Sequence, residues 1–180
     1  QSDTHAVIMQ VGQQLVRALE SRRGTLTFLR DTLNRRADLT PPQLQVLGAS
    51  AAEHTRHLLG VGVIRSGQPP SWWDGPNGLS NSELSQLNRA ILRRTTLPGI
   101  WRVPSTFVTT TPPARQLLVM LEPLRAAAYR QSALMGVFDL QPLLEDFFAA
   151  SLPVRFPVQV LDDDAVLYRS TGWQPASPEH

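Results

Sequence analysis

The chain has 180 residues, of which 42% are hydrophobic and 18% charged, and this composition is typical of one globular domain. All 17 basic residues are arginines, so the pI of about 9.9 reflects a net charge of only +2 in a chain without lysine or cysteine. The lack of lysine excludes Schiff-base and P-loop chemistry, and the lack of cysteine excludes thiol catalysis, thiolate metal sites and disulfides.

The arginines are scattered rather than gathered in a basic run with interleaved aromatic residues, so nucleic-acid binding is not predicted. No stretch approaches the ~18 apolar residues of a membrane span, and no signal peptide is recognisable. The chain begins at Gln1 within a predicted helix and ends soon after its last predicted strand. We therefore expect a domain cut from a longer protein.

A long amphipathic helix is predicted for residues 4–36. Its apolar positions recur every three or four residues: Ile8, Val11, Leu15, Leu19, Leu26, Leu29 and Leu33. The apolar stripe is interrupted at Arg22. Gly24, two residues further on, could mark a bend, because glycine costs a helix about 1 kcal/mol relative to alanine. At ~1.5 Å per residue this helix is longer than a small domain. We expect its first half to project and pair with a second copy; alternatively, the whole helix lies along its own sheet.

A second helix is predicted to start at Pro41, with Thr40 as its N-cap and an apolar stripe that continues to Leu58. A loop rich in glycine, proline and serine is expected at residues 66–80, before a third helix at residues 82–94 capped by Ser80 or Asn81. The predicted strands are residues 59–65, 100–103, 106–110, 116–121, 132–139, 156–161 and 165–170.

The stretch from residue 116 to residue 170 organises the predicted domain as two strands, a helix and a terminal hairpin. Gly136 lies within the second of these strands, at a point where backbone or ligand could come close. Asp139 is well placed to cap the following helix, whose apolar face must lie on the sheet. Asp162, Asp163 and Asp164 form the expected hairpin turn.

Four features point to a known group of proteins. They are a long leading helix running into Leu39-Thr-Pro-Pro42, a strand at residues 61–65, a strand at residues 118–124 that ends in Glu-Pro-Leu, and Gly136-Val-Phe-Asp-Leu140 followed by a helix and the hairpin of residues 158–170. In these features the chain resembles the extracytoplasmic PAS-like sensor domains (the Cache, CHASE or PDC group) of bacterial transmembrane receptors such as histidine kinases. Asp164-Ala165 stands where the final hairpin of that group has a turn glycine.

The resemblance implies an α+β fold: a long N-terminal helix plus a PAS-like five-stranded antiparallel sheet with helices packed on one face. It implies a ligand cavity on the other face, covered by the excursion between the first and second strands. By this resemblance, residues 1–38 form a signalling and dimerisation helix, residues 39–171 the sensor domain and residues 172–180 a tail. The module would be an extracytoplasmic homodimer between flanking transmembrane segments, with a small-molecule ligand and no cofactor.

Two pairs of an aromatic residue and an arginine are candidate ligand-binding residues. Trp101 and Arg102 lie on a predicted short strand, and Tyr129 and Arg130 lie beside the central hairpin. An arginine next to an aromatic ring suits a carboxylate or phosphate, because the guanidinium offers a planar fork and the ring excludes water. The alternative is a buried Trp101 with a solvated Arg102, since neighbours in a strand point to opposite faces.

Three further residues are candidates. Asp139 could bind a ligand amine, although its capping role explains it better. Trp72 and Trp73, followed by an aspartate, could cap a pocket or touch a membrane surface or partner; anchoring of the loop by one tryptophan explains them equally well.

Metal and catalytic motifs are weak in this sequence. His54 and His57 would share one helix face, but no third ligand is near in sequence, and the three consecutive aspartates at residues 162–164 lack the further spaced oxygens of a calcium loop. No nucleophile elbow, paired-carboxylate frame or phosphate loop is present, so the sequence predicts no enzyme.

Two functions remain after this reading, with an unrecognised hydrolase as a weaker third. A ligand-binding sensor would have a partly polar cavity under residues 66–80 and a parallel dimer along the leading helix. An interaction or dimerisation module of the same fold would instead have that cavity filled by side chains such as Phe107, Met120 and Met135.

Overall fold

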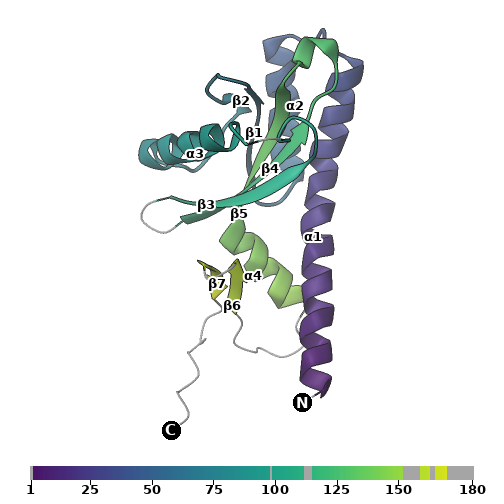
Figure 1. Ribbon diagram of the computed structural model, residues 1–180, viewed down its shortest axis with the longest axis vertical. Coiled ribbons are helices and arrows are strands. Elements are labelled where there is room, and N and C mark those ends of the chain that lie inside the picture. The colour runs from purple at the N-terminus through teal and green to yellow at the C-terminus, as the bar shows by residue number, and fades with distance from the viewer. Residues whose placement is uncertain (1, 98, 112–114, 152–158, 163–164, 170–180) are drawn as a thin grey trace.

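The computed structural model describes residues 2–97, 99–111, 115–151, 159–162 and 165–169 (Figure 1). Helix α1 (Ser2–Arg35) runs along the full height of the molecule, and α2 (Pro41–His54) turns back beside its C-terminal part (Figure 1). The long helix is therefore confirmed, and it continues through Gly24 without interruption. The expected turn of residues 162–164 and the tail of residues 172–180 lie wholly or partly outside the described residues.

A five-stranded antiparallel sheet forms the centre of the fold, with strand order β2-β1-β5-β4-β3. Its strands are β1 (Leu58–Arg65), β2 (Ser71–Asp74), β3 (Ser105–Thr111), β4 (Arg115–Pro123) and β5 (Ser132–Asp139). Helix α3 (Asn81–Arg94) lies in the connection from β2 to β3, and the short helix η1 (Ala127–Tyr129) in the connection from β4 to β5. The α+β fold with helices packed on a five-stranded antiparallel sheet is thus confirmed.

Helix α4 (Leu140–Ser151) follows β5 and packs against β4, β5 and α1. The hairpin of β6 (Gln159–Asp162) and β7 (Ala165–Arg169) forms a separate two-stranded sheet beside α4. The terminal hairpin was correctly predicted, but it does not join the central sheet.

Alternation along the strands builds a hydrophobic core on each face of the sheet. The face toward α1, α2 and α4 contains Leu26, Leu33, Val63, Leu134, Phe138 and Leu144. The face toward α3 contains Ile64, Leu87, Ile91, Phe107, Val119 and Met135. Helices therefore cover both faces, whereas the resemblance implied helices on one face and a cavity on the other.

Gly136 marks the closest approach of α1 to the sheet. A Cβ atom at this position would lie 2.7 Å from a methyl group of Leu26, a fully buried residue of α1. The glycine in the central strand thus lets a helix, rather than a ligand, come close to the backbone.

Three local predictions were wrong. Residues 100–103 form a turn instead of a strand, because the backbone NH groups of Arg102 and Val103 donate to the carbonyl of Gly99, whose φ is +86°. The expected loop around Trp72 and Trp73 contains the edge strand β2. Helix α2 ends at His54, so Leu58 belongs to β1 rather than to the helix.

Candidate functional site

A groove of about 640 Å³ lies at the end of the molecule where α1 stops, on the face of the sheet toward α1 and α2. We call it the aromatic groove. Its walls come from the α1–α2 connection, the first turns of α2, the ends of β1 and β2, and η1. Two smaller hollows lie beside α3, with volumes of about 340 and 130 Å³.

The α2 wall is held by a reciprocal cap at the start of the helix. The backbone NH of Gln43 donates to Thr40 Oγ1 at 3.4 Å, and the backbone NH of Thr40 donates to Gln43 Oε1 at 2.9 Å. Pro41 and Pro42 fix the first turn and present their rings to the groove. The wall is therefore set before any occupant binds.

The β2 wall depends on strand alternation. Trp73 packs with the core on the helix face, whereas Trp72 packs with the α3 side, where its Nε1 donates to Asn88 Oδ1 at 3.1 Å. Both residues line the groove; the indole of Trp72 anchors β2 to α3, and pairing with β1 holds the strand on its other side. Pocket lining and loop anchoring, which the sequence left as alternatives, are combined in this strand.

The Arg65 guanidinium lies at the groove, in cation–π contact with the ring of Tyr129. The guanidinium carbon of the exposed Arg65 lies 5.8 Å from the ring centre of the buried Tyr129. Arg65 is the single charged residue that lines the groove in the described part of the chain. The aromatic–arginine pair at this site is thus Tyr129 with Arg65, because Arg130 is an exposed neighbour that does not line it.

The remaining candidate residues lie elsewhere. Trp101 packs with the core on the α3 side, and Arg102 is exposed in the turn next to it. Asp139 directly precedes α4, and its Oδ2 accepts a hydrogen bond from Arg115 Nη2 at 2.8 Å. The structure therefore brings together Trp72, Trp73 and Tyr129 and separates them from Trp101, Arg102 and Asp139.

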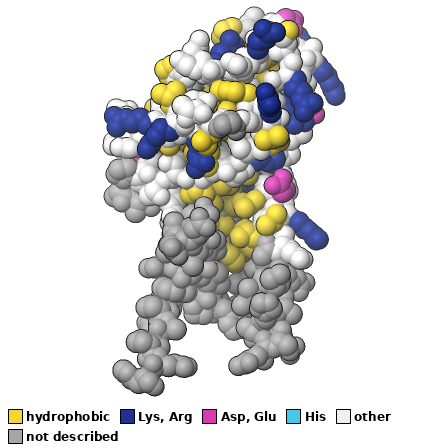
Figure 2. All heavy atoms as spheres, viewed as in Figure 1, with side chains coloured by type: hydrophobic (Ala, Val, Ile, Leu, Met, Phe, Trp, Pro, Cys, Tyr) yellow, Lys and Arg dark blue, Asp and Glu magenta, His cyan; other side chains and the backbone are white. Residues whose placement is uncertain are grey.

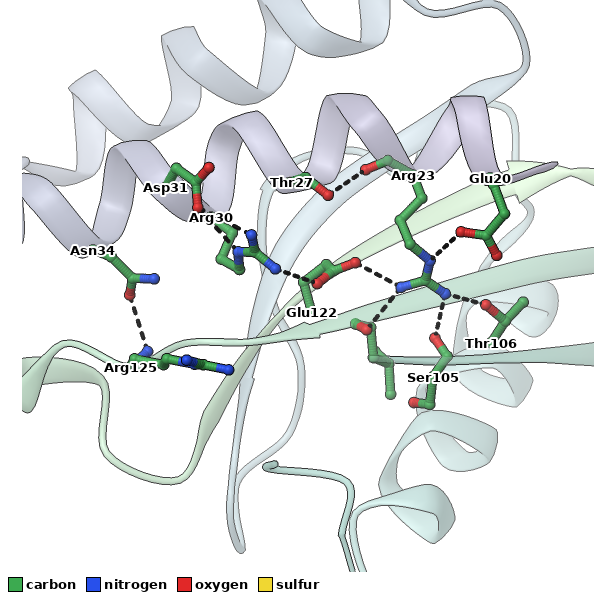
Figure 3. A network of polar contacts seen from close by, with 11 residues as sticks. Glu20, Arg23, Thr27, Arg30, Asp31, Asn34, Ser105, Thr106, Glu122 and Arg125 are labelled. Atoms are coloured by element: carbon green, nitrogen blue, oxygen red, sulfur yellow. Dashed lines mark hydrogen bonds and ion pairs between the residues drawn. The ribbon is translucent and has the colours of Figure 1, made fainter. Parts of the chain in front are cut away.

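A buried carboxylate links α1 to the sheet (Figure 3). Glu122 of β4 is 1% exposed, and its two oxygens accept from Arg23 Nη1 at 2.7 Å and from Arg30 Nη1 at 3.0 Å. We call these three residues the Glu122 cluster. Both arginines come from α1, so one carboxylate fixes the helix to one strand at two positions about two turns apart.

Arg23 uses its remaining donors on the same strands. Its Nη1 donates to the Leu121 carbonyl at 3.2 Å, and its Nη2 donates to the Ser105 carbonyl at 3.0 Å and to the hydroxyl of Thr106 (Figure 3). This one side chain therefore contacts both β3 and β4.

A second link joins the last turn of α1 to the segment that leads into the groove. The side-chain oxygen of Asn34 accepts hydrogen bonds from the backbone NH groups of Arg125 and Ala126, at 2.9 and 3.1 Å. The same segment continues into η1 and Tyr129. The wall of the groove and the end of α1 are thus connected by direct hydrogen bonds.

A histidine–aspartate pair joins the α2–β1 connection to α4. Nε2 of His57 lies 2.6 Å from Asp146 Oδ2, and Arg56 Nη2 lies 3.2 Å from the same oxygen. The hydrogen bond from His57 and the positive charge of Arg56 hold the pKa of the Asp146 carboxyl below its usual value. The two histidines do not share a helix face, since His57 follows the end of α2 with φ of +68°.

Among the described residues, no group of three or more histidine and acidic side chains is arranged to hold a metal ion. Comparison of the chain with protein-family models, with curated proteins and with solved structures finds no match. The class that the structure itself defines is an α+β domain with a long helix bound to a five-stranded sheet.

The sequence predicted three lining residues of the groove but not Arg65 or the Glu122 cluster. A signal for the cluster was present, because Glu122 is the one acidic residue in the apolar run from Leu117 to Leu124. Arg23 and Arg30 are seven residues apart, which is about two helical turns on one face. The gap in the apolar stripe falls at Arg22, and the next residue, Arg23, is the one that contacts this carboxylate.

Proposed function

We propose that the chain is an extracytoplasmic stimulus-sensing module of a transmembrane signal-transduction receptor, of the histidine-kinase type, and that it signals through α1. The module has no catalytic activity of its own in this proposal. The Glu122 cluster is the observation that supports it most strongly, because it ties the long helix to the sheet by buried polar contacts.

A buried ion cluster adds little net stability, but it can fix the position of a helix relative to the sheet on which it packs. Taking charges out of water costs much of what their attraction returns, so apolar side chains would hold a helix to a sheet at least as well. A carboxylate shared by two arginines, however, is satisfied in one position of the helix and not in a position shifted by one residue. A shift of the sheet would therefore be passed to α1 as a whole, which is what a signalling helix requires.

The aromatic groove gives a stimulus direct access to the same helix. Ala37 and Leu39 line it and follow α1 directly in the chain, and the Asn34 hydrogen bonds fix the segment before Tyr129. An occupant in contact with β1, β2 and η1 would thus also contact the end of α1. Differential contact of this kind is the physical requirement for a ligand to shift a conformational equilibrium.

Pairing of α1 with the α1 of a second copy is part of the proposal. The side of α1 opposite the core presents Arg17, Ser21, Gly24 and Phe28, which recur every three or four residues and are all exposed. Phe28 is 68% exposed, an unusual state for a phenylalanine, and Val16 of the same helix is 59% exposed. A parallel homodimer would cover this side.

The proposed location follows from the receptor assignment. The transmembrane segments would flank this chain in the longer protein. In the part of the chain that the structure describes, no helix is both long enough and apolar enough to cross a bilayer.

The test joins a ligand screen to a report on α1. A thermal-shift screen against organic acids, amino acids and sugars should yield a compound that raises the melting temperature as RT ln(1 + [L]/Kd) requires. The chain contains no cysteine, so a Ser21→Cys variant can report pairing of α1 by disulfide formation without other substitutions. We expect the compound to change the yield of linked dimer. Binding that leaves the yield unchanged would count against signalling through α1.

One observation favours a second function, an interaction or dimerisation module without a small-molecule ligand. Phe107 and Met135 are buried against α3, so side chains occupy the place where the resemblance implied a cavity. Met120, the third expected filler, is instead buried on the opposite face. A screen without a single stabilising compound, together with strong pairing of α1, would favour this function over the first.

A further inference from the structure

We infer that the aromatic groove binds an organic carboxylate with a flat or compact apolar body, and that Arg65 is the residue that holds the carboxylate. This inference rests on the proposed sensing function and names the ligand class and the site. The site lies on the face of the sheet toward α1 and α2, whereas the resemblance implied a cavity on the face beneath α3.

The first argument is that the hydrogen-bond donors of the Arg65 side chain are not used by the described residues. Its side chain makes no hydrogen bond or ion pair with any described residue, although the stacked contact with Tyr129 holds it in place. This cation–π contact, at 5.8 Å, uses none of the guanidinium NH donors in a hydrogen bond. Those donors therefore remain available for a bidentate contact with a carboxylate.

The second argument is charge. No acidic side chain is among the residues that line the groove. At the same end of the molecule, the exposed charged residues at the end of α1 and around η1 are Arg35, Arg36, Asp38, Arg125 and Arg130. Figure 2 shows the same imbalance on the visible face, where arginine side chains outnumber acidic ones over the upper part of the molecule. A cation in such surroundings selects an anionic group.

The third argument is the nature of the remaining walls. Beyond Arg65 the groove offers apolar side chains from three sides, with Leu39 and Leu44 from the α2 side, Val63 from the sheet and Trp73 from the edge strand. Its uncharged polar side chains are Gln45, Ser71 and Tyr129. An anion without a hydrocarbon body, such as phosphate, would leave these walls in contact with water.

The size of the groove also suits a small molecule. Its volume of about 640 Å³ falls within the ~300–1,000 Å³ range that is typical of small-molecule sites. The capped first turn of α2 and the strand pairing of β2 hold the walls in place without an occupant. The groove is therefore preorganised, which lowers the entropic cost of binding.

The test is a calorimetric titration of the full chain with four probes: benzoate, acetate, inorganic phosphate and benzyl alcohol. Benzoate combines the two features that the groove recognises, acetate and phosphate lack the apolar body, and benzyl alcohol lacks the charge. We expect benzoate to bind at least about tenfold more tightly than each of the other three, because charge-assisted hydrogen bonds and ring burial both contribute.

Variants assign the binding to Arg65. Arg65→Gln should weaken benzoate binding about tenfold or more, and Arg65→Lys should weaken it less, since lysine keeps the charge but loses the fork and the stacking. Arg102→Gln is the matched control, because Arg102 is an exposed arginine remote from the groove, and it should leave binding unchanged. Circular dichroism and the melting temperature of each variant show whether it is folded.

Several results would overturn the inference: phosphate or benzyl alcohol binding as tightly as benzoate, unchanged binding by folded Arg65→Gln, or equal loss in Arg102→Gln.

Failure of this inference and failure of the proposed function can be told apart. If a sugar or an amine from the screen alters Ser21→Cys pairing while benzoate does not bind, the ligand class is wrong and sensing stands. If benzoate binds through Arg65 without altering the pairing, the site stands and signalling through α1 does not.

Discussion

Glu122 is a carboxylate almost without contact to water, and its two arginine partners both belong to α1. Removing one member of a buried ion cluster leaves the others desolvated without compensation. The ion pairs of Glu122 therefore add little to the free energy of unfolding, but removing the carboxylate leaves two arginines without a partner and lowers that free energy.

We predict that Glu122→Gln lowers the free energy of unfolding by about 3–5 kcal/mol, because two arginines then lose their anionic partner inside the protein. Urea denaturation followed by circular dichroism measures this change. Glu20→Gln is the matched control, since Glu20 is a largely exposed partner of Arg23 at 3.8 Å and should change the stability by less than about 1 kcal/mol. Equal effects of the two substitutions would contradict the structural role of the cluster.

Asp146 gives a prediction on pH. Its pKa is lower in the folded protein than the model-peptide value of 3.8, so the ionised form favours folding. The stability that it contributes is complete above its unfolded pKa and is lost as the pH falls through the folded value. The groups that face it are His57, Arg56 and Arg22.

Asp146→Asn should therefore be less stable than the natural sequence near pH 6, and the difference should shrink as the pH falls below about 4. Unfolding curves of both proteins at several pH values test this. Asp38→Asn serves as the control, because Asp38 is exposed and lies 3.9 Å from Arg36. A difference that stays constant down to pH 2 would mean that the Asp146 carboxylate does not stabilise the fold through its charge.

At the scale of single elements, two glycines lie on opposite sides of the contact between α1 and the sheet. Gly136 of β5 faces the buried Leu26, whereas Gly24 of α1 has no atom within 4 Å of the position of an added Cβ. The same substitution should therefore have opposite effects at these two positions.

We predict that Gly136→Ala destabilises the protein by about 1–3 kcal/mol, because the new methyl group pushes α1 away from the sheet. Gly24→Ala should stabilise it by about 0.5–1 kcal/mol, since alanine is the better helix former at an exposed site. Thermal unfolding of both variants measures the effects. The measurement uses a concentration at which the chain is monomeric, because the proposed pairing of α1 would cover Gly24. Destabilisation of the monomer by Gly24→Ala would contradict an exposed Gly24.

The same elements show what the sequence determines locally. The boundaries of β5 agree with the predicted strand at residues 132–139, because an apolar run that ends at a helix-capping aspartate is recognisable from local sequence alone. The cap at Thr40 was predicted for the same reason, and Ser80 was one of the two caps predicted for α3; each forms a reciprocal hydrogen-bond pair three residues apart.

The errors arose where tertiary pairing overrides local pattern. β2 is a strand because it pairs with β1, although the proline and glycine residues around it favour a loop. The turn at residues 100–103 follows from the positive φ of Gly99, which an apolar count does not reveal. Arg65 and the Glu122 cluster involve side chains up to about a hundred residues apart in sequence, so pattern alone could not join them.

At the scale of the whole molecule, α1 is both the longest element and the one with the most varied anchoring. Apolar packing holds it at Leu26, Leu29 and Leu33, the Glu122 cluster fixes its register, and Asn34 joins its end to the groove. Its opposite side has no partner among the described residues. We interpret this combination as a helix that receives a signal from its own sheet and delivers it to a second copy.

The most direct test is a disulfide scan along α1, with single cysteines at Arg17, Ser21, Gly24 and Phe28 and at the buried-side positions between them. Thr110, which is exposed on the edge strand β3, provides the control position. The proposal predicts fast formation of linked dimers on the exposed side of α1, with a yield that rises and falls every three to four residues, and none at Thr110. A yield that is flat along the helix, or largest at Thr110, would contradict pairing through α1.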